Sequence, residues 1–186
     1  NSSEPRLAIT PRPWLEGARL DASRDFAWAT FAAAQSNRSL RARWLERLLQ
    51  DGVALLSEVP SHAAGILQAA ALVGRVAETN YGLVFDVRSV PQAENLAYTD
   101  LGLGLHTDNP YREPVPGFQV LHALRTAADG GDSLFGDGFA IAEYLRATSA
   151  DAFALLTRTP VPFLYRSKDA ELYAERPLIQ LSCAGE

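Results

Sequence analysis

The chain has 186 residues, the length of one domain, and its hydrophobic share of 47% is ordinary for a globular protein. Its formal net charge of −5 argues against a nucleic-acid-binding protein, which normally presents a basic face, and tolerates a cationic small-molecule ligand. No apolar run approaches the roughly 18 residues that span a bilayer, and the polar start of the chain lacks a signal-peptide core.

The first 36 residues are expected to form an N-terminal segment that packs on the rest of the chain. This segment, 1–36, carries four large aromatic side chains: Trp14, Phe26, Trp28 and Phe31. A helix is predicted next, with Asn37 or Ser39 able to cap it and Gly52 able to end it. Its apolar stripe has helical spacing and consists of Leu40, Trp44, Leu45, Leu48 and Leu49.

Short strands and helices follow in the rest of the chain. Apolar content predicts strands at 53–56, 118–124, 133–135, 161–165 and 178–182. The stretch 81–90 is interpreted as a strand or a strand-rich loop. Helices are predicted at 60–73, 139–146 and 151–157. Helices that precede short strands are typical of an α+β fold, here with a mainly antiparallel sheet.

A His-x-Asp pair opens the most informative stretch of the chain, residues 105–117, whose sequence is LHTDNPYREPVPG. In a strand, residues two apart point to the same face, so the imidazole of His106 and the carboxylate of Asp108 can reach one ion. They would supply two members of the 2-His-1-carboxylate triad that holds non-haem Fe(II) and leaves positions open. A structural role for His106 is the alternative.

Several further blocks occur in a fixed order around this pair: 78–82 (ETNYG), 95–99 (NLAYT), 119–122 (QVLH), 130–133 (GGDS) and 137–138 (DG). With these blocks, the chain from about Leu40 onward resembles the γ-butyrobetaine hydroxylase-like branch of the taurine dioxygenase (TauD/TfdA) family. Members of this family are Fe(II)- and 2-oxoglutarate-dependent oxygenases. The resemblance implies a double-stranded β-helix, or jelly-roll, core behind the N-terminal helices. Residues 37–186 would then be the N-terminal part of the oxygenase domain.

The resemblance also implies roles for individual positions. His106 and Asp108 match the first two iron ligands, and Leu121 and Ser133 match positions that contact 2-oxoglutarate. Ser133 offers a hydroxyl donor to the distal carboxylate of that co-substrate. The nearby His122 matches a position that does not bind the metal, and we expect it to pack in the core.

Other matched positions concern the substrate. Tyr81, Phe85 and Tyr98 match aromatic positions around a trimethylammonium group, which ring faces bind through cation–π attraction. Relatives often have Trp in place of Phe85, and Phe is the weaker ring for such a cation. Asn95 and Asn109 match positions near the anionic end of the substrate. All of these aromatic residues could instead be ordinary core side chains, and Arg112 is either a solvated loop residue or faces an anion.

The resemblance therefore implies a dioxygenase that hydroxylates an aliphatic C–H of a small, γ-butyrobetaine-like zwitterion, with Fe(II), 2-oxoglutarate and O₂ as cofactor and co-substrates. Oxidative decarboxylation of 2-oxoglutarate would accompany the hydroxylation. 2-Aminoethylphosphonate, or its trimethylated form, is the alternative substrate, and a second basic group facing Asn95 and Asn109 would favour it. No nucleic-acid or membrane partner is expected, and the resemblance suggests a homodimer.

Two residues that the family needs are expected beyond the chain. The second His ligand and the Arg that binds 2-oxoglutarate both come later than Glu186, which lies 80 residues after His106. We therefore expect an incomplete family member at the C-terminus, and the lack of any Met indicates a start downstream of the true one. If the chain were instead naturally complete, it would be a non-catalytic binding or regulatory fragment, with exposed sheet edges that invite association.

The single cysteine, Cys183, excludes an internal disulfide and fits a reducing, cytoplasmic compartment. We interpret it as a buried, inert thiol, with a reactive cysteine as the alternative. One cysteine could not supply the thiolate ligands of the zinc-binding module that precedes the oxygenase domain in some relatives.

Overall fold

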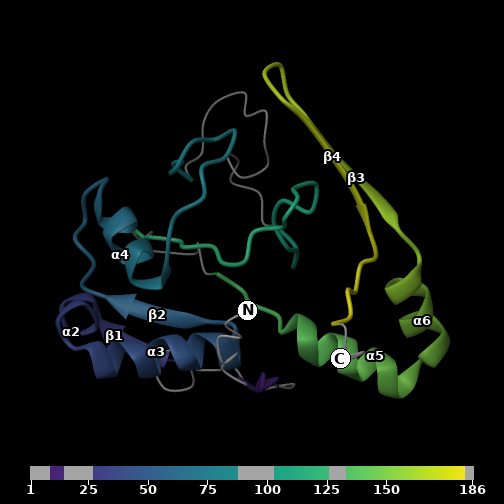
Figure 1. The fold of residues 1–186 in the computed structure, drawn as a ribbon, viewed down its shortest axis with the longest axis horizontal. Coiled ribbons are helices and arrows are strands. Elements are labelled where there is room, and N and C mark those ends of the chain that lie inside the picture. The colour runs from purple at the N-terminus through teal and green to yellow at the C-terminus, as the bar shows by residue number, and fades with distance from the viewer. Residues whose placement is uncertain (1–8, 15–26, 88–102, 126–132, 183–186) are drawn as a thin grey trace, which may run out of the picture. The chain divides into compact units, whose positions relative to one another are not determined.

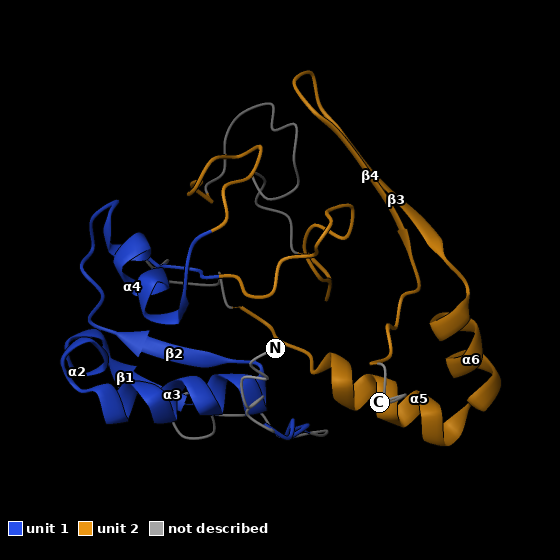
Figure 2. Cartoon of the chain, viewed as in Figure 1, with its two compact units in different colours: residues 1–76, 120–128 blue, residues 77–119, 129–186 orange. Residues whose placement is uncertain are grey.

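A computed structural model describes residues 9–14, 27–87, 103–125 and 133–182 of the chain (Figure 1). The chain divides into two compact units, which Figure 2 shows in blue and orange. Unit 1 comprises residues 1–76 and 120–128, and unit 2 comprises residues 77–119 and 129–186. The predicted boundary after residue 36 falls inside unit 1, and the predicted domain division stays a prediction.

Unit 1 is built around a parallel pair of short strands. Strand β1 (Ala27–Thr30) lies beside β2 (Ala54–Ser57), with Ala27 opposite Ala54 and Thr30 opposite Ser57. Parallel neighbours need a long crossover connection, and here helices α2 (Phe31–Ser36) and α3 (Arg38–Asp51) supply it. Strand β2 confirms the predicted strand at 53–56 within one residue, whereas β1 and α2 were not predicted.

Helix α3 confirms both predicted ends and most of the predicted apolar stripe, of which Leu49 is exposed. The Asn37 side chain caps it by accepting a 3.0 Å hydrogen bond from the Leu40 N–H. Gly52 ends it with a φ of +73°, a left-handed conformation that Gly adopts without steric cost. Trp44 and Leu48 are buried on one face, and the Trp44 indole N–H donates to the Leu55 carbonyl on β2 at 3.1 Å. The helix is thus fixed to the sheet by both packing and a hydrogen bond.

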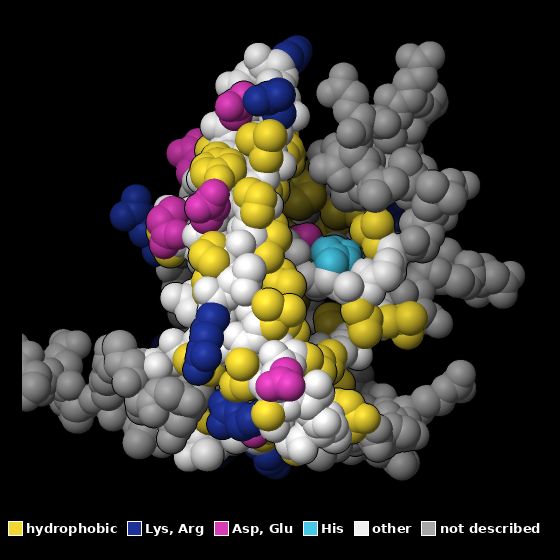
Figure 3. Space-filling model, turned by 90° about the vertical axis from the view of Figure 1, so that its right-hand side faces the viewer, with side chains coloured by type: hydrophobic (Ala, Val, Ile, Leu, Met, Phe, Trp, Pro, Cys, Tyr) yellow, Lys and Arg dark blue, Asp and Glu magenta, His cyan; other side chains and the backbone are white. Residues whose placement is uncertain are grey.

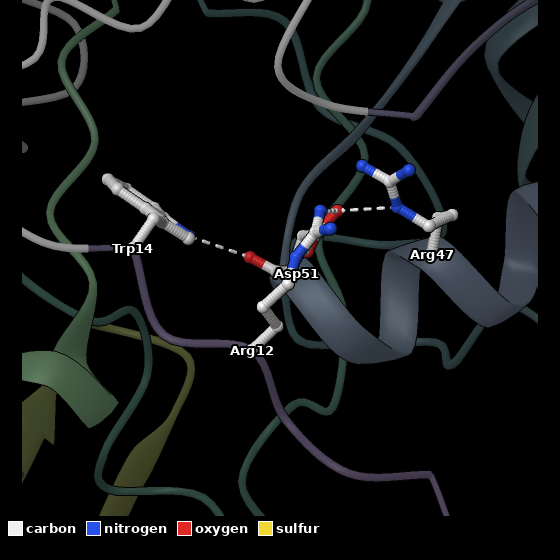
Figure 4. A network of polar contacts seen from close by, with 4 residues as sticks. All are labelled: Arg12, Trp14, Arg47 and Asp51. Atoms are coloured by element: carbon white, nitrogen blue, oxygen red, sulfur yellow. Dashed lines mark hydrogen bonds and ion pairs between the residues drawn. The ribbon is translucent and has the colours of Figure 1, made fainter.

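A buried carboxylate closes the C-terminal end of α3 (Figure 4). The side chain of Asp51 is only 2% exposed and accepts two hydrogen bonds of 2.9 Å each from the guanidinium of Arg12. Arg47, one turn earlier, donates a third at 2.9 Å, and the Trp14 indole donates to the Asp51 carbonyl at 2.9 Å. A negative charge at a helix C-terminus is unfavourable. The two arginines offset that charge and fasten the segment around Arg12 to the helix.

Helix α4 (Gly65–Val73) ends before Gly74 as predicted but begins later than the predicted residue 60. The chain first turns, with the Gly65 N–H bonded to the His62 carbonyl at 2.8 Å. The Pro60 carbonyl oxygen lies only 2.0 Å from where a Cβ on Gly65 would stand. The position is therefore restricted to glycine by this close approach.

Unit 2 consists of a helix pair and a hairpin. Helices α5 (Gly138–Thr148) and α6 (Ala150–Arg158) confirm the two predicted C-terminal helices, and Asp137 caps α5 by accepting from Phe139 and Ala140 at 2.8 and 3.2 Å. Strand β3 (Val161–Arg166) confirms the predicted strand at 161–165 and pairs antiparallel with β4 (Glu171–Arg176). Strand β4 was not predicted.

Three predicted strands are wrong: residues 118–124, 133–135 and 178–182 are described, and none of them is a strand. In 81–90, the described residues 81–87 form no strand, and a single bridge joins Thr79 to Gly82. An apolar run becomes a strand only when a neighbour pairs with it, and within the described ranges these runs have no such neighbour. Helices with small parallel and antiparallel sheets are consistent with the α+β class. The jelly-roll stays a prediction.

Many apolar side chains of unit 2 face outward. On the β3–β4 hairpin, Leu164 stands opposite Tyr173, and their exposed fractions are 52% and 58%. Figure 3 shows hydrophobic side chains in yellow along this hairpin and the helices below it. Among the described residues, no helix is long and apolar enough to cross a membrane.

We predict that Asp51→Ala lowers the free energy of unfolding of the full-length protein by about 2 kcal/mol, because both arginines lose their buried acceptor. Urea denaturation would measure the change. The matched control is Asp169→Ala, because Asp169 is 80% exposed and its ion pair with Lys168 is long, at 4.0 Å. This substitution should change the free energy of unfolding by less than about 0.5 kcal/mol. Equal effects of the two substitutions would contradict the anchoring role of Asp51.

Candidate metal and ligand site

The His-x-Asp pair predicted from the sequence is brought together in unit 2. His106 Nε2 lies 3.3 Å from Asp108 Oδ1, and both side chains are about half exposed. The described residues around the pair form no strand, so the alternation of a strand is not what aligns the two side chains. Donor atoms that bind one metal ion at about 2.1 Å from adjacent corners lie roughly 3 Å apart. The observed spacing fits that arrangement.

The other ring nitrogen of His106 determines how the pair can act. His106 Nδ1 lies 2.7 Å from the Gly104 carbonyl oxygen. Because a carbonyl oxygen only accepts, Nδ1 must carry the proton, and the lone pair of a neutral ring is then on Nε2. The Nε2 lone pair and the Asp108 carboxylate then face each other, and both are donors that one metal ion could share. Metal-binding histidines commonly donate their other N–H to a carbonyl in this way.

No third protein ligand joins the pair within the described ranges, where no group of three or more His, Cys, Asp or Glu residues could hold a metal ion. His122, the other histidine near the pair in sequence, belongs to unit 1. Its Cε1 lies 3.3 Å from where a Cβ on Gly65 would stand, at the start of α4, and its side chain is half-buried. His122 therefore lies against the start of α4, half-buried, and its expected place in the core stays a prediction.

Four aromatic rings form a cluster in unit 2, which we call the aromatic cluster: Tyr81, Phe85, Tyr111 and Tyr165. The rings of Tyr81 and Phe85 are 5.5 Å apart between centroids and tilted by 42° to each other. Tyr165 from β3 meets Tyr81 edge-on at 5.9 Å and stacks on Tyr111 at 5.0 Å. These distances lie in the range of favourable aromatic pairs.

The hydroxyl groups of the cluster perturb one another. Burial, together with hydrogen bonding to Tyr165 and Tyr111, raises the pKa of Tyr81 well above its ordinary value. The hydrogen bond from Tyr81, helped by Ser167, lowers the pKa of Tyr165. Tyr81 therefore keeps its proton and donates the hydrogen bond to Tyr165, and its side chain remains a neutral phenol.

A tight turn joins the His106–Asp108 pair to the aromatic cluster. Asn109 follows Asp108 with a φ of +55°, in the left-handed region that Asn tolerates better than most residues. Its carbonyl accepts from the Arg112 N–H at 3.1 Å, and its side-chain oxygen accepts from the Tyr111 hydroxyl at 2.5 Å. The turn thus places an amide, a ring and a guanidinium directly after the predicted iron ligand.

Two arginines, Arg112 and Arg176, lie at the end of this turn. The Arg112 guanidinium lies 5.8 Å from the centre of the Tyr111 ring and donates to Asn80. Arg176 from β4 donates to the Arg112 carbonyl at 2.6 Å and to the Glu113 carboxylate at 3.0 Å. The Nε atoms of Arg112 and Arg176 are buried without a hydrogen-bond partner among the described residues. Arg112 is therefore half-buried, with its guanidinium held between Tyr111 and Asn80.

The remaining predicted site residues are placed less completely. Leu121 in unit 1 is 66% exposed, and Ser133 in unit 2 is also exposed; their predicted contact with 2-oxoglutarate stays a prediction. Asn95 and Tyr98 lie outside the described residues. Sequence reasoning missed Tyr111 and Tyr165 as members of the cluster. Tyr111 stood in the most informative block, whereas nothing in the sequence around Tyr165 indicated its place.

The comparisons with known proteins agree with the motif blocks. The profile of the family described as "Taurine catabolism dioxygenase TauD, TfdA family" matches residues 16–183. The chain is 41% identical over 173 residues to gamma-butyrobetaine dioxygenase of Pseudomonas sp. (strain AK-1), a match that covers 93% of this chain and 44% of that protein.

Two human proteins are more distant relatives. Gamma-butyrobetaine dioxygenase of Homo sapiens is 32% identical, with 65% of this chain and 31% of that protein covered. Mitochondrial trimethyllysine dioxygenase of Homo sapiens is 31% identical, with 70% and 31% covered. The chain thus spans less than half the length of each of these relatives.

We predict that Asp108→Ala lowers the Fe(II) affinity of the full-length protein at least about tenfold, because it removes one of two adjacent donors. Bound iron after anaerobic loading and desalting would be measured by elemental analysis. His122→Gln is the matched control and should retain iron, since His122 packs against α4 in unit 1. Iron retained by the Asp108 variant, or lost equally from both, would contradict the metal assignment.

Proposed function

The chain belongs to the taurine catabolism dioxygenase TauD, TfdA family, and on this premise we propose that it forms part of an Fe(II)- and 2-oxoglutarate-dependent dioxygenase. Its substrate would be a small zwitterion with a trimethylammonium end, of which γ-butyrobetaine is the leading candidate. The observation that carries the proposal is the His106–Asp108 pair, with Nδ1 of His106 committed to Gly104 and Nε2 turned to the carboxylate. We also propose that the described elements belong to a jelly-roll core.

His106 and Asp108 would hold the metal through Nε2 and a carboxylate oxygen. Bound Fe(II), with 2-oxoglutarate and O₂, supplies the oxidising power that hydroxylates an aliphatic C–H bond. The Gly104 carbonyl fixes the orientation of the imidazole, so the ring does not need to reorder when the ion binds. Leu121 and Ser133 are proposed to contact 2-oxoglutarate, with the Ser133 hydroxyl donating to its distal carboxylate.

The aromatic cluster supports the choice of a cationic substrate end. A quaternary ammonium group cannot donate ordinary hydrogen bonds, and the faces of aromatic rings attract it. Tyr81 and Phe85 lie at cage distance, and Tyr98 is proposed as a further wall. The three relatives described above carry the names of two substrates, γ-butyrobetaine and trimethyllysine, that share this group. The substrate would be held at that end, with one carbon directed toward the metal.

The anionic end would lie at Asn109, with Asn95 as a second proposed contact. Arg112 belongs to the same turn, and its backbone N–H bonds to the Asn109 carbonyl. A basic group this close to Asn109 keeps a phosphonate, such as 2-aminoethylphosphonate or its trimethylated form, as the second candidate substrate. A homodimer is proposed from the resemblance alone.

The test of the proposed function is succinate formation from 2-oxoglutarate by the full-length gene product with Fe(II) and ascorbate. We expect γ-butyrobetaine to stimulate turnover, and Asp108→Ala to abolish the stimulation because the metal is lost. A response to 2-aminoethylphosphonate alone would select the second candidate. If iron binds but neither compound stimulates turnover, the proposed substrate class is wrong. A protein that binds no iron would be the non-catalytic alternative.

We predict that Tyr81→Ala raises the KM for γ-butyrobetaine about 3- to 30-fold, the range that cation–π attraction supplies at a partly desolvated site. Phe85→Trp should lower the KM a few-fold, since Trp is the stronger ring for a cation. Steady-state kinetics on the full-length enzyme would measure both. The control is Tyr144→Ala on α5, because Tyr144 is 59% exposed and outside the cluster. An unchanged KM in both cage variants would sink the cage assignment.

A further inference from the structure

We propose that Tyr111 is a positioning residue that orients the side-chain amide of Asn109, so that the amide N–H groups face the anionic end of the substrate. The inference rests on the function proposed above and adds a determinant of specificity to it. The site would recognise a carboxylate or a phosphonate oxygen through a donor whose direction is set by the protein before the ligand arrives.

The backbone of the turn fixes the position from which the Asn109 side chain extends. The residue follows the predicted metal ligand Asp108 directly, and its φ of +55° turns the chain sharply at that point. The 3.1 Å hydrogen bond from the Arg112 N–H to the Asn109 carbonyl closes the turn. The Asn109 side chain therefore leaves a defined backbone position one residue from the metal pair.

The hydroxyl of Tyr111 then fixes which way the amide points. Its donation to Asn109 Oδ1 at 2.5 Å occupies the oxygen side of the amide. An Asn side chain has one acceptor oxygen and two N–H donors, so the donors are directed to the opposite side. Donors suit an anionic oxygen, and hydrogen bonds to charged groups are the stronger class. The reversed amide would present its oxygen to the ligand and repel it.

Tyr111 is itself held in place by two contacts. Its ring stacks on Tyr165 with centroids 5.0 Å apart and an angle of 27° between planes. The Arg112 guanidinium lies over the same ring at 5.8 Å. Because the ring is supported independently of its hydroxyl, Tyr111→Phe should keep the stack and remove the hydrogen bonds of the hydroxyl to Asn109 and to Tyr81.

The test measures binding of two ligands to the full-length protein by calorimetry, under anaerobic conditions with Fe(II) and 2-oxoglutarate present. γ-Butyrobetaine carries both ends, and butyltrimethylammonium has the same cation without the carboxylate. In Tyr111→Phe we expect the Kd of γ-butyrobetaine to rise about tenfold, as for a lost hydrogen bond. The Kd of butyltrimethylammonium should stay within about twofold. Tyr173→Phe on the exposed hairpin is the matched control and should change neither.

Two further variants separate positioning from a general structural role. Asn109→Ala should weaken γ-butyrobetaine, and Tyr111→Phe added to it should cause no further loss, because the hydroxyl acts through the amide. Asn109→Asp keeps an acceptor for Tyr111 and replaces the donor with a negative charge. It should weaken γ-butyrobetaine more than Tyr111→Phe does and spare butyltrimethylammonium. It also keeps the inference testable if Tyr111→Phe does not fold.

The outcomes distinguish this inference from the proposed function. Equal weakening of both ligands in Tyr111→Phe would mean that the hydroxyl only supports the cluster, and no weakening of either would mean that the amide needs no orientation. Either result overturns the positioning role while the proposed function stands. If the wild-type protein binds neither ligand, the proposed function fails and this inference fails with it.

Discussion

The turn that follows Asp108 is the constraint on which the rest of the candidate site depends. It reverses the chain at Asn109, whose left-handed φ of +55° most side chains would resist. Without that reversal, Tyr111 could not reach back to the Asn109 amide, and its ring could not meet Tyr165 from β3. The His106–Asp108 pair, the Asn109 amide and the aromatic cluster are therefore parts of one local arrangement.

Unit 2 holds this arrangement by means other than a hydrophobic core. The buried apolar residues among the described ranges lie almost all in unit 1, with only Ala140 in unit 2. In unit 2 the contacts are specific ones, with Arg176 from β4 donating to the Arg112 carbonyl and Tyr165 from β3 stacking on Tyr111. Since β3 and β4 pair along their length, the hairpin supports the turn from two points at once. Unit 1, by contrast, is closed by packing around Trp44 and by the buried carboxylate of Asp51.

The sequence predicted the features that depend on contacts between residues close in the chain, and it missed those that depend on distant residues. Helix α3 depends on neighbours three and four residues apart, and its cap at Asn37 and stop at Gly52 were predicted correctly. A strand depends on a distant partner, and the apolar run at 118–124 found none among the described residues. The same holds in the site. Tyr81 and Phe85 are four residues apart and were expected together, whereas Tyr165 contacts Tyr81 from 84 residues further along the chain, a contact that no local pattern encodes. The side chains of His106 and Asp108 lie close together as expected, although the described residues around them form no strand; their role as metal ligands stays a prediction.

The charges around the aromatic cluster favour one orientation of the proposed substrate. Tyr81 keeps its proton because burial and its neighbours raise its pKa, so the rings of Tyr81 and Phe85 offer neutral faces to a cation. At Tyr111 the situation is opposite, because the Arg112 guanidinium already lies over that ring and would repel a second cation. The same positive charge attracts an anion toward Asn109, whose amide donors point away from Tyr111. In the proposed site, a zwitterion would therefore bind in one orientation, with its trimethylammonium group at Tyr81 and Phe85 and its acidic group at the turn. The separation of the two ends of the substrate would then determine which carbon faces the proposed metal ion.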